Sequence, residues 1–148
     1  MKALPVAALG AALLGGAAFA QAAAQTEDTP AGRPGAAVTV VERARTTVTG
    51  QTFEAPPGPL EVVITVTEIP AGGALPMHKH PWPRFAYVER GRLRVRYEAA
   101  NLVREFGPGE AVVEAVDQWH EGEVVGNDPV RLVVVDQVPP GRSNVVAR

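Results

Sequence analysis

The chain contains three histidines, and their spacing suits metal binding. His78 and His80 are separated by one residue, and His120 follows about forty residues later. Residues i and i+2 of a β-strand point to the same face, and neutral imidazole is the commonest protein ligand of transition metals. The pattern predicts that His78, His80 and His120 together hold a metal. The alternative is that the three imidazoles only form hydrogen bonds.

The composition limits what else can bind such a metal. The 148-residue chain has no cysteine, which excludes disulfides, thiolate ligands and cysteine nucleophiles. The ligands must therefore be nitrogen and oxygen atoms. Three neutral imidazoles suit Fe(II), Mn(II), Ni(II), Cu(II) or Zn(II), so the expected cofactor is a divalent transition metal whose identity stays open.

From Val38 onward, short apolar runs alternate with glycine and proline corners, as is typical of a β-sandwich or barrel. Gly91 lies between two runs, where a tight hairpin needs a positive φ, so the strands on either side are expected to pair antiparallel. No later segment shows helical periodicity over more than two turns, which favours a single all-β domain. The expected strands are Val38 to Thr49, Leu60 to Ile69, Phe85 to Val88, Arg92 to Tyr97, Ala111 to Val116, His120 to Val124 and Val130 to Val138.

Two blocks around the histidines resemble the two motifs of the cupin superfamily. The first comprises Gly73, His78-Lys79-His80 and Tyr87 to Leu93, and the second runs from Gly107-Pro108-Gly109-Glu110 through His120 to Asn127. The resemblance covers about Ile69 to Val135. It implies a double-stranded β-helix, or jelly-roll barrel, with a metal at its centre. It also implies that the first two ligands are His78 and His80 and the last is His120.

Arg84 is where the chain departs from the family pattern. Many cupins have a glutamate ligand at this position, and a guanidinium group has no lone pair to give a metal. In one interpretation the metal keeps three histidines and open positions, and Arg84 clamps a substrate anion, similar in outline to the thiol-dioxygenase branch of cupins. In another, Glu114 replaces the missing ligand, or merely pairs with Arg84. The catalytic candidates are thus Arg84, to orient an anion, and Glu114, as a general base.

Aromatic residues are concentrated beside the histidines. Trp82 lies between Pro81 and Pro83, which interrupt a strand and predict a fixed loop at the barrel mouth. We expect Trp82 to contact a ligand, whereas Phe85 and Tyr87 are expected to fill the core.

The N-terminus predicts export. Lys2 is followed by an Ala/Leu/Gly-rich run to Ala20 and by two small-residue motifs of the kind that signal peptidase cleaves. These are the marks of a secretory signal peptide rather than of a membrane anchor. We expect residues 1–24 to be this peptide, residues 25–37 to be a flexible lead-in, and residues 38–148 to be the barrel domain. The mature protein would then be periplasmic or secreted.

The charge indicates the kind of partner. A net charge of -2 without a block of Lys or Arg gives no support for nucleic acid or a membrane surface as a partner. A small-molecule ligand is expected, and Val38 to Thr49 offers a strand edge for a homodimer.

The resemblance implies two kinds of function. One is a metal-dependent oxygenase or isomerase acting on a small anionic or aromatic molecule. The other is a non-catalytic module that binds a small molecule or a metal. An enzyme needs open coordination positions with a pocket above the metal, which a structural site lacks.

Overall fold

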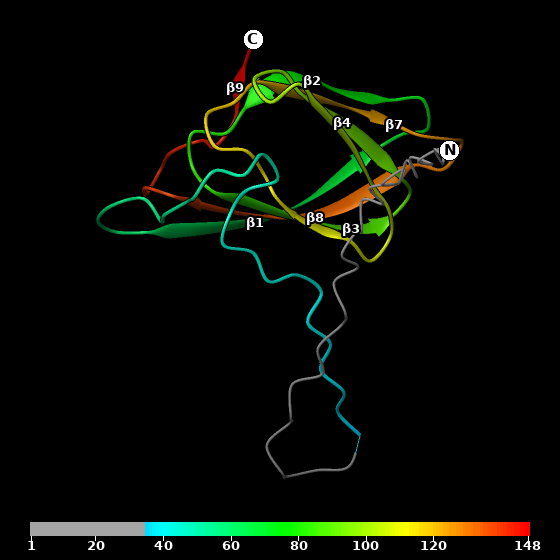
Figure 1. Ribbon diagram of the computed structural model, residues 1–148. Coiled ribbons are helices and arrows are strands. Elements are labelled where there is room, and N and C mark those ends of the chain that lie inside the picture. Colours follow the sequence, from blue (N-terminus) through cyan, green and yellow to red (C-terminus); the bar gives the residue numbers. More distant parts are fainter. Residues whose placement is uncertain (1–34) are drawn as a thin grey trace, which may run out of the picture.

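The computed structural model describes residues 35–148, which form nine β-strands in two sheets (Figure 1). The predicted signal peptide and all but the last three residues of the predicted lead-in lie outside the described residues. Residues 35–148 contain no helix, and so no helix that is long and apolar enough to cross a membrane. The all-β jelly-roll prediction is confirmed.

The strands divide into a four-stranded and a five-stranded sheet with antiparallel pairing. The order in the first sheet is β1-β8-β3-β6, and in the second it is β5-β4-β7-β2-β9. The bounds are β1 (Glu61–Ile69), β2 (Ala74–Lys79), β3 (Arg84–Arg90), β4 (Leu93–Tyr97), β5 (Leu102–Phe106), β6 (Ala111–Val113), β7 (His120–Val124), β8 (Val130–Val138) and β9 (Val146–Ala147).

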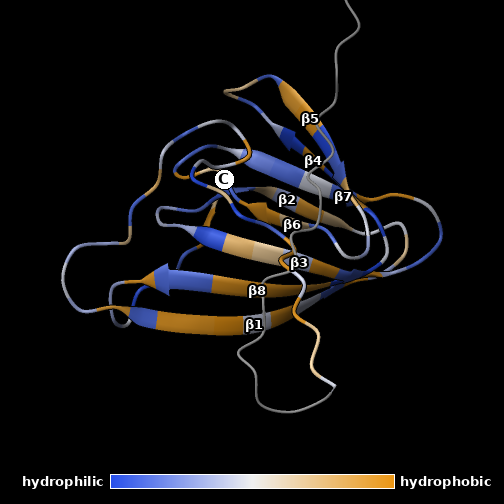
Figure 2. Ribbon diagram, turned by 60° about the horizontal axis from the view of Figure 1, so that its bottom comes forward, coloured by the Kyte–Doolittle hydropathy of each residue, from blue (hydrophilic) through white to orange (hydrophobic). Residues whose placement is uncertain are grey.

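Alternating side chains give the two sheets a shared apolar core. In β8, every second residue from Val130 to Val138 is buried, and the residues between them are half-buried. Successive side chains of a strand point to opposite faces, so the buried set of β8 faces the other sheet. In β4, the alternating residues Leu93, Val95 and Tyr97 are buried in the same way. Figure 2 shows the apolar stretches of β1 and β8 lying side by side.

The hairpin expected around Gly91 is wrong. β3 pairs with β6 and β8, whereas β4 pairs with β5 and β7, so the chain passes from one sheet to the other at this point. Gly91 does have a positive φ of 77°. A Cβ atom there would lie 2.5 Å from the carbonyl oxygen of Pro129. This glycine therefore allows two backbone segments to approach closely where the sheets join.

The strand expected at Val38 to Thr49 is also wrong. The segment forms no strand, and Thr39 and Thr46 take part only in isolated bridges, Thr46 with Thr52. Val38 and Val41 are 47% and 48% exposed. The run from Ala111 ends as a strand at Val113. Strands that were not expected are β2, β5 and β9.

Candidate metal centre

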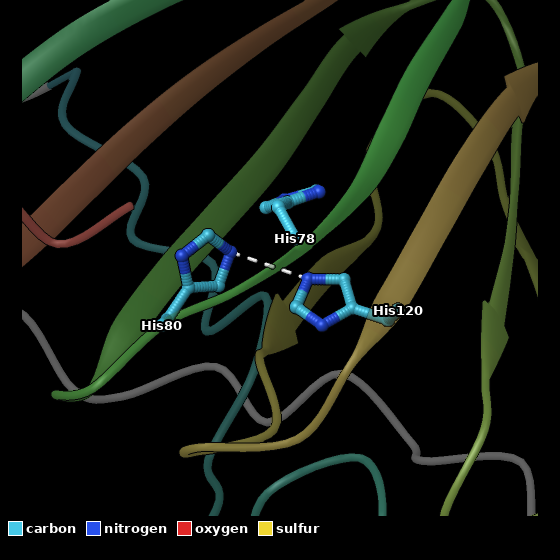
Figure 3. A group of neighbouring side chains, drawn as sticks. All are labelled: His78, His80 and His120. Atoms are coloured by element: carbon cyan, nitrogen blue, oxygen red, sulfur yellow. Dashed lines mark hydrogen bonds between the residues drawn. The ribbon is translucent and has the colours of Figure 1, made fainter. Parts of the chain in front are cut away.

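The three histidines come from two neighbouring strands and converge inside the molecule (Figure 3). His78 lies in β2 directly opposite His120 at the start of β7, and His80 follows β2. The ring centroid of His78 lies 4.8 Å from that of His80 and 4.4 Å from that of His120. His80 and His120 are 1% and 2% exposed. The predicted juxtaposition of the three rings is therefore present.

Backbone carbonyl groups fix the tautomer of every ring. A carbonyl oxygen can only accept, so a ring nitrogen in contact with one must carry the hydrogen. A neutral imidazole has a single N–H group, which leaves its other nitrogen, Nε2, with a free lone pair. The contacts are 2.6 Å from His78 Nδ1 to Pro76 O, 2.7 Å from His80 Nδ1 to Asn144 O, and 2.9 Å from His120 Nδ1 to Gln118 O.

The distance between two of these lone pairs suits a shared cation. Nε2 of His80 and Nε2 of His120 are 3.2 Å apart, the contact drawn as a dashed line in Figure 3. If both Nδ1 atoms donate to carbonyls, neither Nε2 of a neutral ring can donate to the other. Two nitrogens about 2.1 Å from one ion are about 3.0 Å apart at a right angle and about 3.4 Å apart at a tetrahedral angle. The candidate ligand atoms of all three rings lie within 4.8 Å of one another.

Burial keeps the three rings neutral, the form in which imidazole binds metals. Loss of water contact is the largest cause in each case, because it disfavours the charged imidazolium. It lowers the pKa of His80 to about 2, with the Arg84 guanidinium as the second cause. It also lowers the pKa of His78 and the pKa of His120. The cluster can therefore hold a divalent metal.

Glu114 lies just after β6 and is buried beside the histidines. Its Oε2 accepts a 2.8 Å hydrogen bond from the Tyr97 hydroxyl and lies 4.0 Å from His120 Nε2. Burial raises the pKa of the Glu114 carboxyl and the pKa of the Tyr97 hydroxyl. Only the three histidines form the converging group of ligand atoms found among the described residues, so direct ligation by Glu114 stays a prediction.

Arg84 pairs with Asp136 and not with Glu114, so that predicted pairing is wrong. Arg84 and Asp136 are opposite residues of β3 and β8, and two parallel hydrogen bonds of 2.7 Å join them. The contact between Arg84 and Glu114 is through the backbone, where the Glu114 N–H donates to the Arg84 carbonyl at 2.9 Å. Among the described residues none accepts a hydrogen bond from Arg84 Nη1.

The sequence of the central strands places the chain in a family. A family model described as "Cupin domain" matches residues 65–136, which include all three histidines. The chain belongs to the cupin superfamily. No curated protein matches it.

Solved structures agree with the cupin fold. A DMSP lyase, DddQ from Ruegeria pomeroyi DSS-3, is 22% identical with a TM-score of 0.50, over 58% of this chain and 42% of that chain. The oxalate decarboxylase of Lactobacillus farciminis, in a formate complex, is 23% identical with a TM-score of 0.50, over 58% of this chain and 26% of that chain. This cupin thus spans less than half the length of either protein, and identities this low show the fold alone.

The site of this cupin opens into a cavity of about 360 Å³. The three histidines, Arg84 and Glu114 all line it. Most of the remaining wall is apolar and comes from both sheets, including Leu75, Leu93, Val95, Leu132 and Val134. A pocket of this size, with few polar groups at one place, is the usual form of a small-molecule site.

Three residues of the site were not predicted from the sequence. Asp136 is the one acidic residue in the buried row of β8. An acidic residue at a buried position of an apolar alternation could have indicated from the sequence that it has a polar partner. Tyr97 is fully buried and supports Glu114. Asn144 gave no signal, because its contacts depend on where the chain returns after β8.

The aromatic residues are placed differently from the expectation. Trp82 is not among the residues that line the cavity, and the guanidinium of Arg142 lies 6.0 Å from its ring centroid. Tyr87 is 37% exposed, so it does not fill the core. Phe85 packs edge to face against Phe53, with ring centroids 5.9 Å apart.

Proposed function

We propose that this cupin binds one divalent transition metal through Nε2 of His78, His80 and His120, and uses it to bind and transform a small molecule in the adjoining cavity. The single observation that carries the proposal is the set of three anchored Nδ1 atoms, which leaves a lone pair on Nε2 of each ring, in a cluster whose ligand atoms lie within 4.8 Å of one another. Iron, manganese, nickel, copper and zinc all suit these ligands.

A metal held by three side chains would keep coordination positions open for a substrate, and it would act as a Lewis acid that polarises the substrate. The residues of the chain then determine what fits. The apolar wall favours a molecule with a compact hydrocarbon or aromatic body. Arg84 Nη1 offers a hydrogen bond to an acceptor on that molecule, and Asp136 holds the guanidinium in place. Glu114, supported by Tyr97, is the carboxyl nearest to the histidines for exchange of a proton.

Metal analysis of the purified protein tests the site. We expect about one divalent ion per chain, and we expect the double variant His78→Ala with His120→Ala to lose it. Lys79→Ala is the matched control, since Lys79 lies between two of the ligands in sequence but pairs with Asp117 at 2.6 Å. Equal metal content in the double variant and in the wild type would refute the proposed site.

Turnover distinguishes an enzyme from the alternative, a module that only binds. Small carboxylic acids and phenols are incubated with the metal-loaded protein, and O₂ uptake and product formation are followed. An enzyme gives product with the wild type and with Lys79→Ala, but not with the double histidine variant. Saturable binding that depends on the histidines, without product, would favour the binding module.

Export is a separate proposal that rests on the N-terminal sequence. Residues 1–24 have the composition of a cleaved signal peptide. We expect the mature protein in the periplasm or the medium, with an N-terminus near Gln21 or Gln25. N-terminal sequencing of the fractionated protein checks this, and a cytoplasmic protein that retains Met1 would contradict it.

A further inference from the structure

Strand β1 exposes an apolar row at an open edge of the molecule. Val62, Ile64 and Val66 are 53%, 68% and 49% exposed. They alternate with Thr65 and Thr67, which line the cavity, so the apolar row faces outward. β1 is the last strand of its sheet, and its one partner strand there is β8. Figure 2 shows it as the outermost strand, with a long apolar stretch.

The exposure is concentrated where a neighbouring strand is missing. Across the ladder, Ile64 lies opposite Val135 and Val66 lies opposite Val133, and both β8 valines are only half-buried on the same outer face. Within residues 35–148, no hydrogen bond outside the β1–β8 ladder reaches the backbone of β1. A long, apolar edge strand without an internal proline or lysine is a site of strand addition. Residues 61–69 have neither.

We propose that β1 pairs antiparallel with β1 of a second copy of this chain, about a two-fold axis at Ile64. The strand is complementary to a second copy of itself. This register places Ile64 opposite Ile64 of the second copy and Val62 opposite Val66 of the second copy, so the outward apolar row continues across the axis. It keeps Glu61 and Glu68 from facing each other.

Registers displaced toward the C-terminal end of β1 are less favourable. A shift of the axis to Thr65 would put Glu68 of one copy opposite Val62 of the other. An axis between Ile64 and Thr65 would bring Glu61 opposite Glu68, two like charges, and would mismatch the two faces. The axis at Ile64 joins the four-stranded sheets of the two copies into one sheet of eight strands.

The pairing also bears on the cavity. Its exposed lining residues include Thr65 of β1 and Val145 and Ala147 of the C-terminal segment. The mouth therefore lies beside the edge at which the second copy would dock. A dimer of this kind narrows access to the site without replacing any of its ligands.

Oligomeric state, measured by sedimentation or light scattering, tests the proposal. We expect a wild-type dimer, and we expect Ile64→Lys to weaken dimerisation by about tenfold or more, because two like charges meet at the axis. Val103→Lys is the matched control. Val103 is 56% exposed on β5, an edge strand of the other sheet, and its variant stays dimeric. A wild-type monomer at all concentrations, or equal effects of the two variants, would overturn the proposal.

Cross-linking tests the register. The chain has no cysteine, so Ile64→Cys introduces a single thiol that should form a disulfide-linked dimer on mild oxidation. A mixture of Val62→Cys and Val66→Cys chains should cross-link as a heterodimer, and each of them alone should not. Efficient cross-linking of Val62→Cys alone would exclude this register. Metal content is measured in every variant, because its retention separates this interface from the metal site.

Discussion

At the scale of single residues, the charge of Arg84 is already compensated. The side chains of Arg84 and Asp136 are 17% and 8% exposed, and they meet in a bidentate pair. Asp136 also accepts a 2.6 Å hydrogen bond from Asn144 Nδ2. Arg84 therefore offers a bound molecule a positioned N–H donor more than a free positive charge. This distinguishes it from the anion clamp that the sequence suggested.

Removing one member of this pair should be costly. Asp136→Asn leaves the Arg84 guanidinium buried without a counter-charge, and we expect the free energy of unfolding to fall by about 3 kcal/mol. Chemical denaturation of the metal-free protein measures it. The double variant Arg84→Met with Asp136→Leu should recover most of the loss, since it buries no charge. A loss for Asp136→Asn below about 1 kcal/mol would show that water reaches the pair.

The residues of the site differ in how far sequence could predict them. His78, His80 and His120 were predictable because their side chains come from a strand pair whose register the motif implies. The partners of their Nδ1 atoms were not, since Pro76 and Gln118 contribute backbone carbonyl groups, which every residue has. The partner of Arg84 required the register between β3 and β8, which periodicity alone does not fix.

At the scale of elements, the segment after β8 completes the candidate metal centre. The backbone carbonyl of Asn144 orients His80. The side chain of Asn144 forms hydrogen bonds with both the N–H and the C=O of Trp82 and with Asp136. Beyond it, β9 pairs with β2 at His78 and Lys79. One short return of the chain thus supports two of the candidate ligands and the Arg84 pair.

Asn144→Ala should weaken metal binding without removing a ligand. It deletes the side-chain bonds that hold the carbonyl against His80, and loss of such an outer hydrogen bond costs about 10- to 100-fold in metal affinity. Competition with a chelator of known affinity measures the change. Ser143→Ala is the control, because its hydroxyl bonds only to the exposed backbone of Val145. Unchanged affinity in Asn144→Ala would mean that the loop backbone alone positions His80.

Elements with strong alternation were predictable, and short or irregular ones were not. β7 and β8 have the expected bounds. In β8 bulky apolar residues recur at a period of two, and in β7 glutamates alternate with His120, Gly122 and Val124. β2 contains Pro76 and an irregularity between Leu75 and His78, and β9 has two residues, too few for any pattern. In the run from Val38 to Thr49, Val38 and Val41 are about half-exposed and only Val48 packs against the core, so composition alone misled the prediction.

At the scale of the whole molecule, the fold depends on how the chain changes sheets. The prediction of an all-β barrel followed from strand count and turn spacing, but which strands are neighbours did not. A glycine with positive φ between two runs suits a hairpin and a sheet-to-sheet crossing equally well. Contact with a distant segment decides between them, and here that segment is Pro129 and Val130.

Two glycines with the same backbone strain separate the crossing from an ordinary turn. Gly91 has a φ of 77° and Gly109 a φ of 86°, so an alanine costs about 1 to 2 kcal/mol at either position. At Gly109 a Cβ meets nothing within 4 Å, whereas at Gly91 it would lie 2.5 Å from Pro129 O and 2.8 Å from Val130 Cα. Both contacts are backbone atoms that cannot rotate away.

We therefore expect Gly91→Ala to lower the free energy of unfolding by about 3 kcal/mol or more, and Gly109→Ala by about 1 to 2 kcal/mol. Urea denaturation of the two variants and the wild type measures the difference. The additional loss of unfolding free energy in Gly91→Ala measures the cost of separating the two sheets at their junction. Each sheet contributes a wall of the cavity, so this separation would also move the cavity walls apart. Equal losses would show that the junction can open by a few tenths of an ångström at no cost, and that Gly91 serves only as a turn.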